Sequence, residues 1–304
     1  RIAEIARDCR FESSGSLKGT LADQWKEFFY CESISNDVLV LKGQKIESYE
    51  SFSEDLKTMN ELSKILTKKR KEDGALDFFN SELKFNTGSD GEVLDIKSRD
   101  YKDAEKLIEN FMIAANIVVT DHFGYIDFPF IFRVHPEPNM KKLIDTLNNM
   151  KNIDKLKGIE ETSLNEHINN LEKKLKLEKT NVDQKAINKF LDQIINEPYY
   201  ETVSKMLLTS MEKAYYSSEN IGHFALTSDG YSHFTSPIRR AADLVNHFII
   251  DYIMEYHSLP GIKRRAELEK KFIILSQQLP SICEHISQTE ILADKAEQEA
   301  EKIK

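Results

Sequence analysis

The chain has 304 residues, of which 40% are hydrophobic and 31% are charged, a balance typical of a globular protein with one large domain or two ordinary ones. No apolar run approaches the roughly 20 residues that span a bilayer, so a membrane protein is not expected. The net charge of −9 argues against a generally basic nucleic-acid binder, although a basic cleft can lie in an acidic body.

The cysteine content bears on the cellular compartment. Three cysteines, Cys9, Cys31 and Cys283, lie far apart without CxxC spacing, which disfavours a structural zinc site and favours reduced thiols. We therefore expect a cytoplasmic protein. The first residues lack the apolar core of a secretory signal, and they do not begin with Met, which leaves room for residues upstream.

The first long pattern after a weakly readable N-terminal part is an amphipathic helix over Ser53 to Glu72 that ends near Gly74. Residues 75–85 and 92–97 predict a strand pair joined by the turn residues 86–91. Residues 103–120 predict a helix that is apolar on nearly every face and therefore buried. The positions that support the first helix are Leu56, Met59, Leu62, Ile65 and Leu66.

A short apolar strand over residues 128–132 precedes Arg133 and His135, and two prolines then break the backbone. Residues 140–197 have helical periodicity, and Ser204 to Tyr216 predicts a helix whose Met206, Leu207 and Met211 face a core. Residues 240–257 predict a long amphipathic helix. Two further helices are expected after it, the last with a solvated outer face.

Between the predicted helix of Ser204 to Tyr216 and the predicted helix of residues 240–257, residues 222–240 read GHFALTSDGYSHFTSPIRR. Thr235, Ser236 and Pro237 predict a turn directly before a helix, with Pro near the first helical position. The N–H groups of that helix start, together with Arg239 and Arg240, suit an anion, because arginine forks match phosphate oxygens.

His223, His233 and Tyr231 add hydrogen-bond donors and a stacking surface, so a ligand with phosphate and sugar is favoured. The alternative is a helix capped by Ser or Thr in which Arg239 pairs with Asp243 four residues later. Glu109 supports the functional interpretation, since a carboxylate inside an apolar helix needs a partner. An arginine from a distant segment is a plausible partner.

Residues 222–247 closely resemble the signature of the ribonuclease II / ribonuclease R family, the RNB catalytic domain. Five companion segments follow the family order: KKRKEDGALDF, GEVLDI, LIENFMIAAN, FRVHPEP and ADKAEQEAEK. The resemblance implies an α+β fold of RNB type, with a mixed or antiparallel sheet packed with many helices and a helix-rich C-terminal half. It divides the chain into a segment 1–37 and an RNB-like part 38–304.

The same resemblance implies processive, hydrolytic 3′→5′ degradation of single-stranded RNA to nucleoside 5′-monophosphates, with Mg²⁺ held by clustered aspartates, by a monomer without a membrane partner. It places Arg239 at the scissile phosphate and Glu109 at the catalytic end of an RNA channel. It makes Phe78 a stacking partner of the terminal bases. The further residues expected to bind RNA are Arg133, His135, His223, Tyr231, His233, Thr235, Ser236 and Arg240.

Two features depart from the family pattern. The aspartate cluster, a DxxxxxDxDD-like run, is not found, so no metal ligands are assigned in this chain, and Ala241 stands where the family has an aromatic residue. A catalytic domain without its aspartate-bearing front part and a catalytically inactive RNB-fold RNA-binding protein both fit. A third alternative is a helical interaction protein with an accidental match. We expect the chain alone to bind RNA and to hydrolyse it poorly or not at all.

Overall fold

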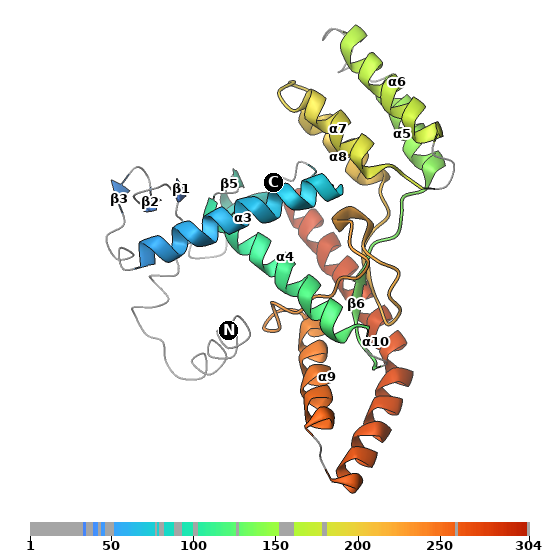
Figure 1. Cartoon of the computed structure of the whole chain (residues 1–304). Helices are drawn as coiled ribbons and strands as arrows, with labels where there is room; N and C mark the ends of the chain where they lie inside the picture. Colours follow the sequence, from blue (N-terminus) through green and yellow to red (C-terminus); the bar gives the residue numbers. More distant parts are fainter. Residues whose placement is uncertain are drawn as a thin grey trace. The chain divides into compact units, whose positions relative to one another are not determined.

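A computed structural model describes residues 33–34, 39–41, 44–45, 52–76, 78, 82–87, 93–99, 103–125, 128–151, 161–177, 181–258 and 261–302. These residues are rich in helix and contain only short strands (Figure 1). The chain divides into two compact units, residues 1–67 with 81–111 and residues 68–80 with 112–304. Most of the predicted N-terminal segment, with Cys9 and Cys31, lies outside the described residues.

The strands of the first unit pair in antiparallel fashion. Strands β1 (Ser33–Ile34), β2 (Leu39–Leu41) and β3 (Gln44–Lys45) form one sheet in that order. Strand β4 (Glu82–Thr87) pairs with β5 (Val93–Arg99), as the turn residues between them predict. The first strand of this pair begins at Glu82, so the prediction that it begins at residue 75 is wrong.

Helix α3 (Ser53–Asp73) has the predicted bounds, and Gly74 ends it with a φ of +115°, a conformation that glycine adopts without strain. Within the first unit, Leu56 of α3 packs with Ala104 and Leu107 of helix α4 (Asp103–Phe123). Beside this contact, the buried amide of Asn110 on α4 donates to the hydroxyl oxygens of Ser63 (2.7 Å) and Thr67 (2.9 Å) on α3.

Ala104 and Leu107 near the start of α4 are fully buried, but the expectation that the apolar middle of the helix is buried is wrong. Its deeply buried positions from Asn110 onward are polar, Asn110, Asn116 and Thr120, whereas Val118 is 64% exposed. Apolar residues are distributed evenly around the helix, so their pattern does not predict which face is buried. The polar residues on the buried face are held there by specific hydrogen bonds.

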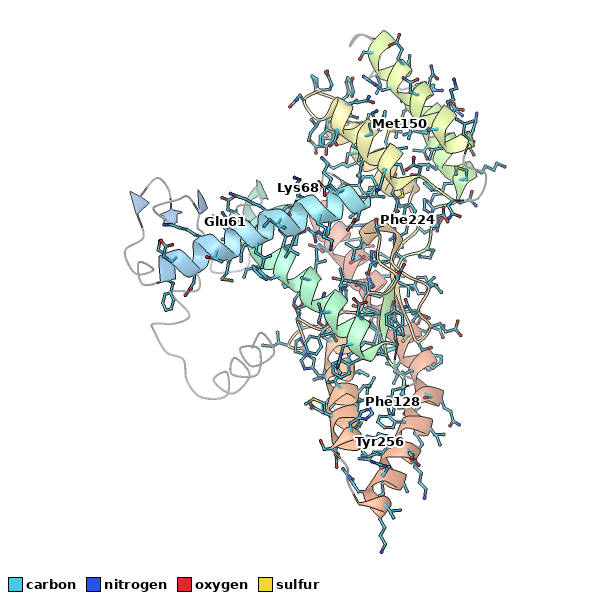
Figure 2. The ribbon with its side chains drawn as sticks, in the orientation of Figure 1. Glu61, Lys68, Phe128, Met150, Phe224 and Tyr256 are labelled. Carbon is cyan, nitrogen blue, oxygen red and sulfur yellow. The ribbon has the colours of Figure 1, made fainter. Side chains whose placement is uncertain are left out.

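Four helices of the second unit surround a common apolar core: α5 (Met140–Met150), α6 (Glu161–Leu177), α7 (Gln184–Ile194) and α8 (Tyr200–Ser210). Met150 lies fully buried within it (Figure 2). Leu207 and Met211 are buried there and Met206 packs against them, which confirms the predicted core face. The side chains of Asn139 and Asp183 cap α5 and α7 by accepting backbone N–H bonds.

The prediction that one helix extends from Ser204 to Tyr216 is wrong. Helix α8 ends at Ser210, and Tyr215–Ser217 forms strand β7, which pairs antiparallel with β6 (Phe132–Val134). Two adjacent tyrosines favour a strand where a partner is available, and the partner lies about eighty residues earlier in the chain.

Helix α9 (Ala241–His257) is followed by one helix, α10 (Ile262–Lys302), instead of the two that were expected. Pro280 lies inside α10, yet the helix continues because the residues around the proline are held by burial of Leu279 and Cys283. Phe128 packs edge-on against Tyr256 of α9 at a centroid distance of 5.6 Å and in a tilted arrangement against Phe272 of α10 at 4.5 Å, which joins the two helices (Figure 2). Among the described helices, none combines the length and apolar character of a membrane span.

Asn246 of α9 fixes the chain just before β6. Its side chain is fully buried; Oδ1 accepts the Ile131 N–H at 2.9 Å, and Nδ2 donates to the carbonyl oxygens of Ile131 (2.8 Å) and His233 (3.3 Å). One amide therefore satisfies three backbone groups that are removed from water.

We predict that Asn246→Ala lowers the free energy of unfolding by about 2–4 kcal/mol, because buried backbone groups lose their partners. Urea unfolding measures the change. Asn169→Ala, at an exposed position on α6, is the matched control and should change the stability by less than about 0.5 kcal/mol. Equal effects of the two substitutions would contradict the role assigned to Asn246.

Candidate functional site

Residues 222–240 lie against strand β6 and the residue that follows it, held by backbone hydrogen bonds. Arg133 N–H donates to Tyr231 C=O at 2.8 Å, His135 N–H donates to Gly222 C=O at 3.1 Å, and Phe224 N–H donates to His135 C=O at 2.8 Å. Gly222 has a φ of +79°, which a side chain would disfavour. Sequence-distant predicted site residues are thereby brought together on one scaffold.

His135 and His223 form a stacked pair with ring centroids 5.1 Å apart. Nδ1 of His135 accepts the Ala225 N–H at 3.0 Å, so its Nε2 carries the hydrogen and donates to the Glu212 carbonyl at 2.7 Å. Burial lowers the pKa of His135, and burial with the adjacent His135 and Arg133 lowers the pKa of His223 to about 3. Both rings are neutral at physiological pH.

His233 is the third neutral imidazole. Burial, followed by the positive charges of Arg240 and Arg133, lowers its pKa to about 2. Burial raises the pKa of Tyr216 to about 12, so this hydroxyl keeps its proton and donates to Nδ1 of His233 at 2.9 Å. A ring with so low a pKa is a weak base and offers hydrogen bonds and an aromatic face instead of proton transfer.

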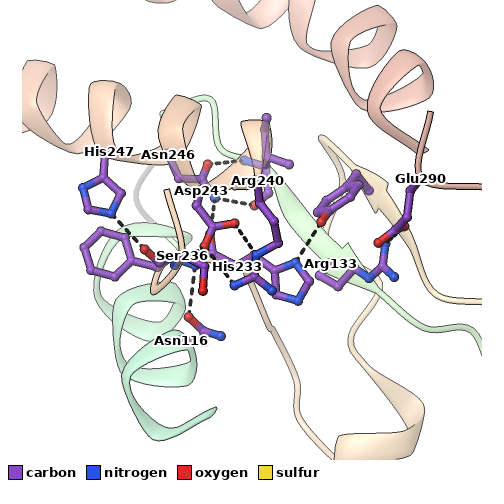
Figure 3. Close-up of polar contacts among 12 residues, drawn as sticks. Asn116, Arg133, His233, Ser236, Arg240, Asp243, Asn246, His247 and Glu290 are labelled. Carbon is purple, nitrogen blue, oxygen red and sulfur yellow. Dashed lines mark hydrogen bonds and ion pairs between the residues drawn. The ribbon is translucent and has the colours of Figure 1, made fainter. Parts of the chain in front are cut away.

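Asn116 of α4 links Tyr231 to Phe234, and Figure 3 shows the second of these contacts. Its Nδ2 donates to the Tyr231 hydroxyl at 2.8 Å, and its Oδ1 accepts the Phe234 N–H at 3.0 Å. Phe234 in turn stacks on His247 of α9 at 4.0 Å, and His247 Nε2 bonds the Phe234 carbonyl at 2.8 Å. These contacts hold both sides of the loop that carries His233.

Asp243, in the first turn of α9, organises the arginine pair (Figure 3). Its fully buried carboxylate accepts the Ser236 N–H at 2.7 Å and pairs with the Arg240 guanidinium, with Nε to Oδ2 at 2.9 Å and Nη2 to Oδ1 at 3.0 Å. The side chain of Arg239 is exposed, and no described residue forms an ion pair or hydrogen bond with its guanidinium.

Two local expectations are therefore corrected. Arg240, three residues before Asp243, forms the ion pair that the alternative interpretation assigned to Arg239. The helix begins at Ala241, so Pro237 is not near its first position, and neither Thr235 nor Ser236 caps it. Instead the helix supplies the carboxylate that binds the turn. The hydroxyls of Thr235 and Ser232 are buried and have no hydrogen-bond partner among the described residues.

Arg133 has a partner that sequence reasoning did not find. It pairs with Glu290 of α10 at 2.5 Å and lies over the Tyr216 ring at 4.7 Å (Figure 3). Glu109 is 39% exposed at its side chain and lies 3.4 Å from Lys106 of the same helix, so its partner is a neighbouring lysine instead of the expected distant arginine.

Phe78 is half-buried and packs against the core of the α5–α8 helices. Phe78 is not part of a strand. Its partial exposure leaves room for a ligand contact, and its buried part contributes to packing.

The sequence reasoning also missed Asn116, Tyr216, Asp243 as an organiser, Asn246 and Glu290. A usable signal existed for two of them: Asp243 and Asn246 share one face of an otherwise apolar helix, where polar residues mark specific buried contacts. Glu290 lies 157 residues from Arg133, and no local pattern connects them.

Magnesium was expected from the family resemblance. Across the parts of the chain that the structure describes, no group of three or more His, Cys, Asp or Glu side chains could hold a metal ion. These residues therefore do not fit a magnesium site, and no chemical step is assigned to a metal.

The RNB domain family model matches residues 33–256, and the chain belongs to this family. Its curated relatives include ribonuclease R 1 of Lactococcus lactis, 35% identical over 88% of this chain and 30% of the relative. Ribonuclease R of Thermotoga maritima is 35% identical over 83% of this chain and 32% of the relative. The chain thus spans about a third of the length of these proteins.

Solved structures of Mycoplasma genitalium RNase R are also similar. The complex with ribose-methylated single-stranded RNA matches with a TM-score of 0.65 and 26% identity, over 85% of this chain and 36% of that one. The complex with double-stranded RNA matches with a TM-score of 0.68 and 25% identity, over 85% and 41%.

The neutral histidines predict a defined acid sensitivity. His223 and His233 titrate at about 3 and about 2 in the folded protein, against an ordinary value of 6.5. The unfolded chain therefore binds protons below pH 6.5 that the folded chain does not. The contribution of the two neutral rings to the free energy of unfolding is therefore fully present above pH 6.5. It is lost as the pH falls below 6.5, by up to about 1.4 kcal/mol per pH unit for each ring.

We predict that His233→Gln, which can still accept the Tyr216 hydroxyl, flattens this decline by up to one ring's share. Urea unfolding from neutral to mildly acidic pH measures the slope. His285→Gln, at an exposed position on α10, is the control and should keep the wild-type slope. A wild-type slope in His233→Gln as well would show that this imidazole is not buried in its neutral form.

Proposed function

We propose that the protein is a hydrolytic exoribonuclease of the ribonuclease R type, which degrades single-stranded RNA from the 3′ end and releases nucleoside 5′-monophosphates. Membership of the RNB family and the likeness to ribonuclease R support this proposal. For the fold of the domain we propose an α+β arrangement of RNB type, with a mixed or antiparallel sheet packed with many helices. The observation that carries the proposal is the exposed Arg239, which the Asp243–Arg240 pair leaves available for a ligand.

The chemistry of the neighbouring side chains is consistent with a nucleic-acid backbone as the ligand. An unpaired guanidinium binds phosphate through a planar fork. His223, His233 and Tyr231 offer neutral aromatic groups for sugar and base contacts, and Thr235 has a hydroxyl without a partner among the described residues. We propose that Arg239 contacts the scissile phosphate, where charge accumulates in the transition state.

The other predicted contacts have supporting roles in this proposal. The carboxylate partners of Arg133 and Arg240 fix the positions of these two guanidinium groups, and Ser236 and His135 hold the loop beside them. Glu109 at the catalytic end of the channel remains a prediction.

The direct test is incubation of 5′-labelled single-stranded RNA with the full-length protein and Mg²⁺, followed by separation of the products, beside the 304-residue chain alone, which is expected to bind RNA and to hydrolyse it poorly or not at all. Stepwise shortening from the 3′ end with release of 5′-mononucleotides is expected. Internal cleavage would contradict an exonuclease. Tight binding without any hydrolysis would instead identify an RNB-fold protein that binds RNA and does not cut it.

We predict that Arg239→Ala in the full-length protein lowers the single-turnover cleavage rate by about 100- to 1,000-fold and lowers RNA affinity far less, because many contacts share binding whereas few act on the transition state. Arg239→Lys should recover only part of the rate, because a point charge does not reproduce the fork. Thermal melting checks that both variants are folded. Near-normal turnover of folded Arg239→Ala would remove the support for this assignment.

We predict that Phe78→Ala weakens RNA binding by roughly 1–3 kcal/mol and leaves longer end products, because the terminal bases lose a stacking partner. Product length on sequencing gels and fluorescence anisotropy measure the two effects. Unchanged products and affinity, together with reduced stability, would make Phe78 purely a core residue.

A further inference from the structure

Helices α6 and α7 of the second unit enclose a hollow of about 330 Å³ that takes no part in the site above. Its floor is apolar and includes the buried side chains of Leu171 and Phe190, and Leu177 at its rim is 72% exposed. A volume of this size is at the lower end of small-ligand pockets, which hold ligands of roughly 300–1,000 Å³. It therefore admits a single small unit of a ligand at a time.

The rim of the hollow is basic. Lys173 and Lys174 reach it from α6 and Lys189 from α7, and no carboxylate is among the described residues that line it. All three lysines are exposed, and none forms an ion pair with another described residue. In contrast, Lys151 and Lys176 nearby are both engaged by Glu172. In a chain of net charge −9, a cluster of uncompensated lysines creates a local positive potential.

The ordinary explanation of lysines near a helix end is their favourable interaction with the helix dipole. It covers Lys174, which lies in the last turn of α6. It does not cover Lys189, which lies in the middle of α7 (Gln184–Ile194) and faces the same hollow. Two helices thus direct positive charge to one place.

Amide groups complete the lining. Asn170 and Gln193 are exposed beside the lysines, and each offers both donors and an acceptor. Lysines alone would suit any polyanion. An apolar floor with amides and a ring of cations suits a nucleotide in particular, whose base is flat and edged with polar groups and whose phosphate is anionic.

We infer that the α6–α7 hollow is an accessory RNA site, which takes one nucleotide of a single strand with its phosphates on Lys173, Lys174 and Lys189. This inference rests on the proposed function, because it assumes that RNA is the substrate. The site holds RNA through its backbone and is separate in sequence from the Arg239 loop. An acidic peptide is the competing occupant, and the experiment distinguishes the two.

The test compares the wild-type chain with the variant Lys173→Gln/Lys174→Gln/Lys189→Gln and with a control of equal net charge, Lys141→Gln/Lys263→Gln/Lys270→Gln. The control lysines are exposed and do not line the hollow. Binding of a fluorescein-labelled oligoadenylate is measured by anisotropy over a range of KCl concentrations. Each neutralised phosphate contributes about 0.7 to the slope of log K against log salt, and one nucleotide within a strand is flanked by two phosphates, so the hollow variant should lose about 1.4 from the slope while the control keeps it.

Photo-crosslinking supplies a second readout that does not depend on charge. An oligonucleotide with 4-thiouridine should crosslink to peptides of α6 or α7 in the wild-type chain and in the control, and not in the hollow variant. Equal slopes in both triple variants, or no crosslink on α6 and α7, would overturn the inference and leave the proposed function standing. Competition by polyglutamate that removes those crosslinks while overall RNA binding persists would assign the hollow to an acidic peptide. Absence of any RNA binding by wild type would overturn the proposed function and this inference with it.

Discussion

The buried carboxylate of Asp243 is the constraint on which the candidate site depends. A carboxylate with no exposure is costly unless it is paired and hydrogen-bonded, and here it is satisfied by Arg240 and by the N–H of Ser236. Both partners lie in the turn before α9, so satisfying Asp243 fixes that turn. It also distinguishes two adjacent arginines: Arg240 is retained inside the protein, and Arg239 is directed to the surface.

The rest of the site supports this arrangement with groups that are neutral or internally paired. The imidazoles of His135, His223 and His233 are held uncharged by burial, which keeps them as fixed hydrogen-bonding and aromatic surfaces. Arg133 is neutralised by Glu290. Arg133 and Arg240 are both ion-paired, which makes the exposed guanidinium of Arg239 distinctive, and the hydrogen-bonded loop that carries it fits a role in positioning a phosphate. The lysines of the α6–α7 hollow would act differently, as flexible point charges that hold a strand.

Sequence reasoning succeeded where the determinants are local. The periodicity of α3 and its end at Gly74, the core face of α8 at Leu207 and Met211, and the RNB signature itself were all readable. It failed where a distant partner decides. Tyr215–Ser217 forms a strand because β6 pairs with it, and α10 continues through Pro280 because packing outweighs one lost hydrogen bond. The choice of Arg240 over Arg239 depends on the turn, since spacings of three and four residues are both favourable on a helix. The roles of Arg239, Glu109 and Phe78 remain predictions from the family resemblance.

The central claim is that Asp243 holds Arg240 inside the protein and leaves Arg239 at the surface. Urea unfolding of Arg240→Ala, compared with Arg239→Ala, tests it most directly. Loss of Arg240 leaves the buried Asp243 carboxylate with one fewer partner, so the account predicts a decrease of about 2–4 kcal/mol in the free energy of unfolding, with allowance for the partial exposure of Arg240. Loss of the exposed Arg239 should change it by less than about 0.5 kcal/mol. Equal losses, or a larger loss for Arg239→Ala, would contradict the account.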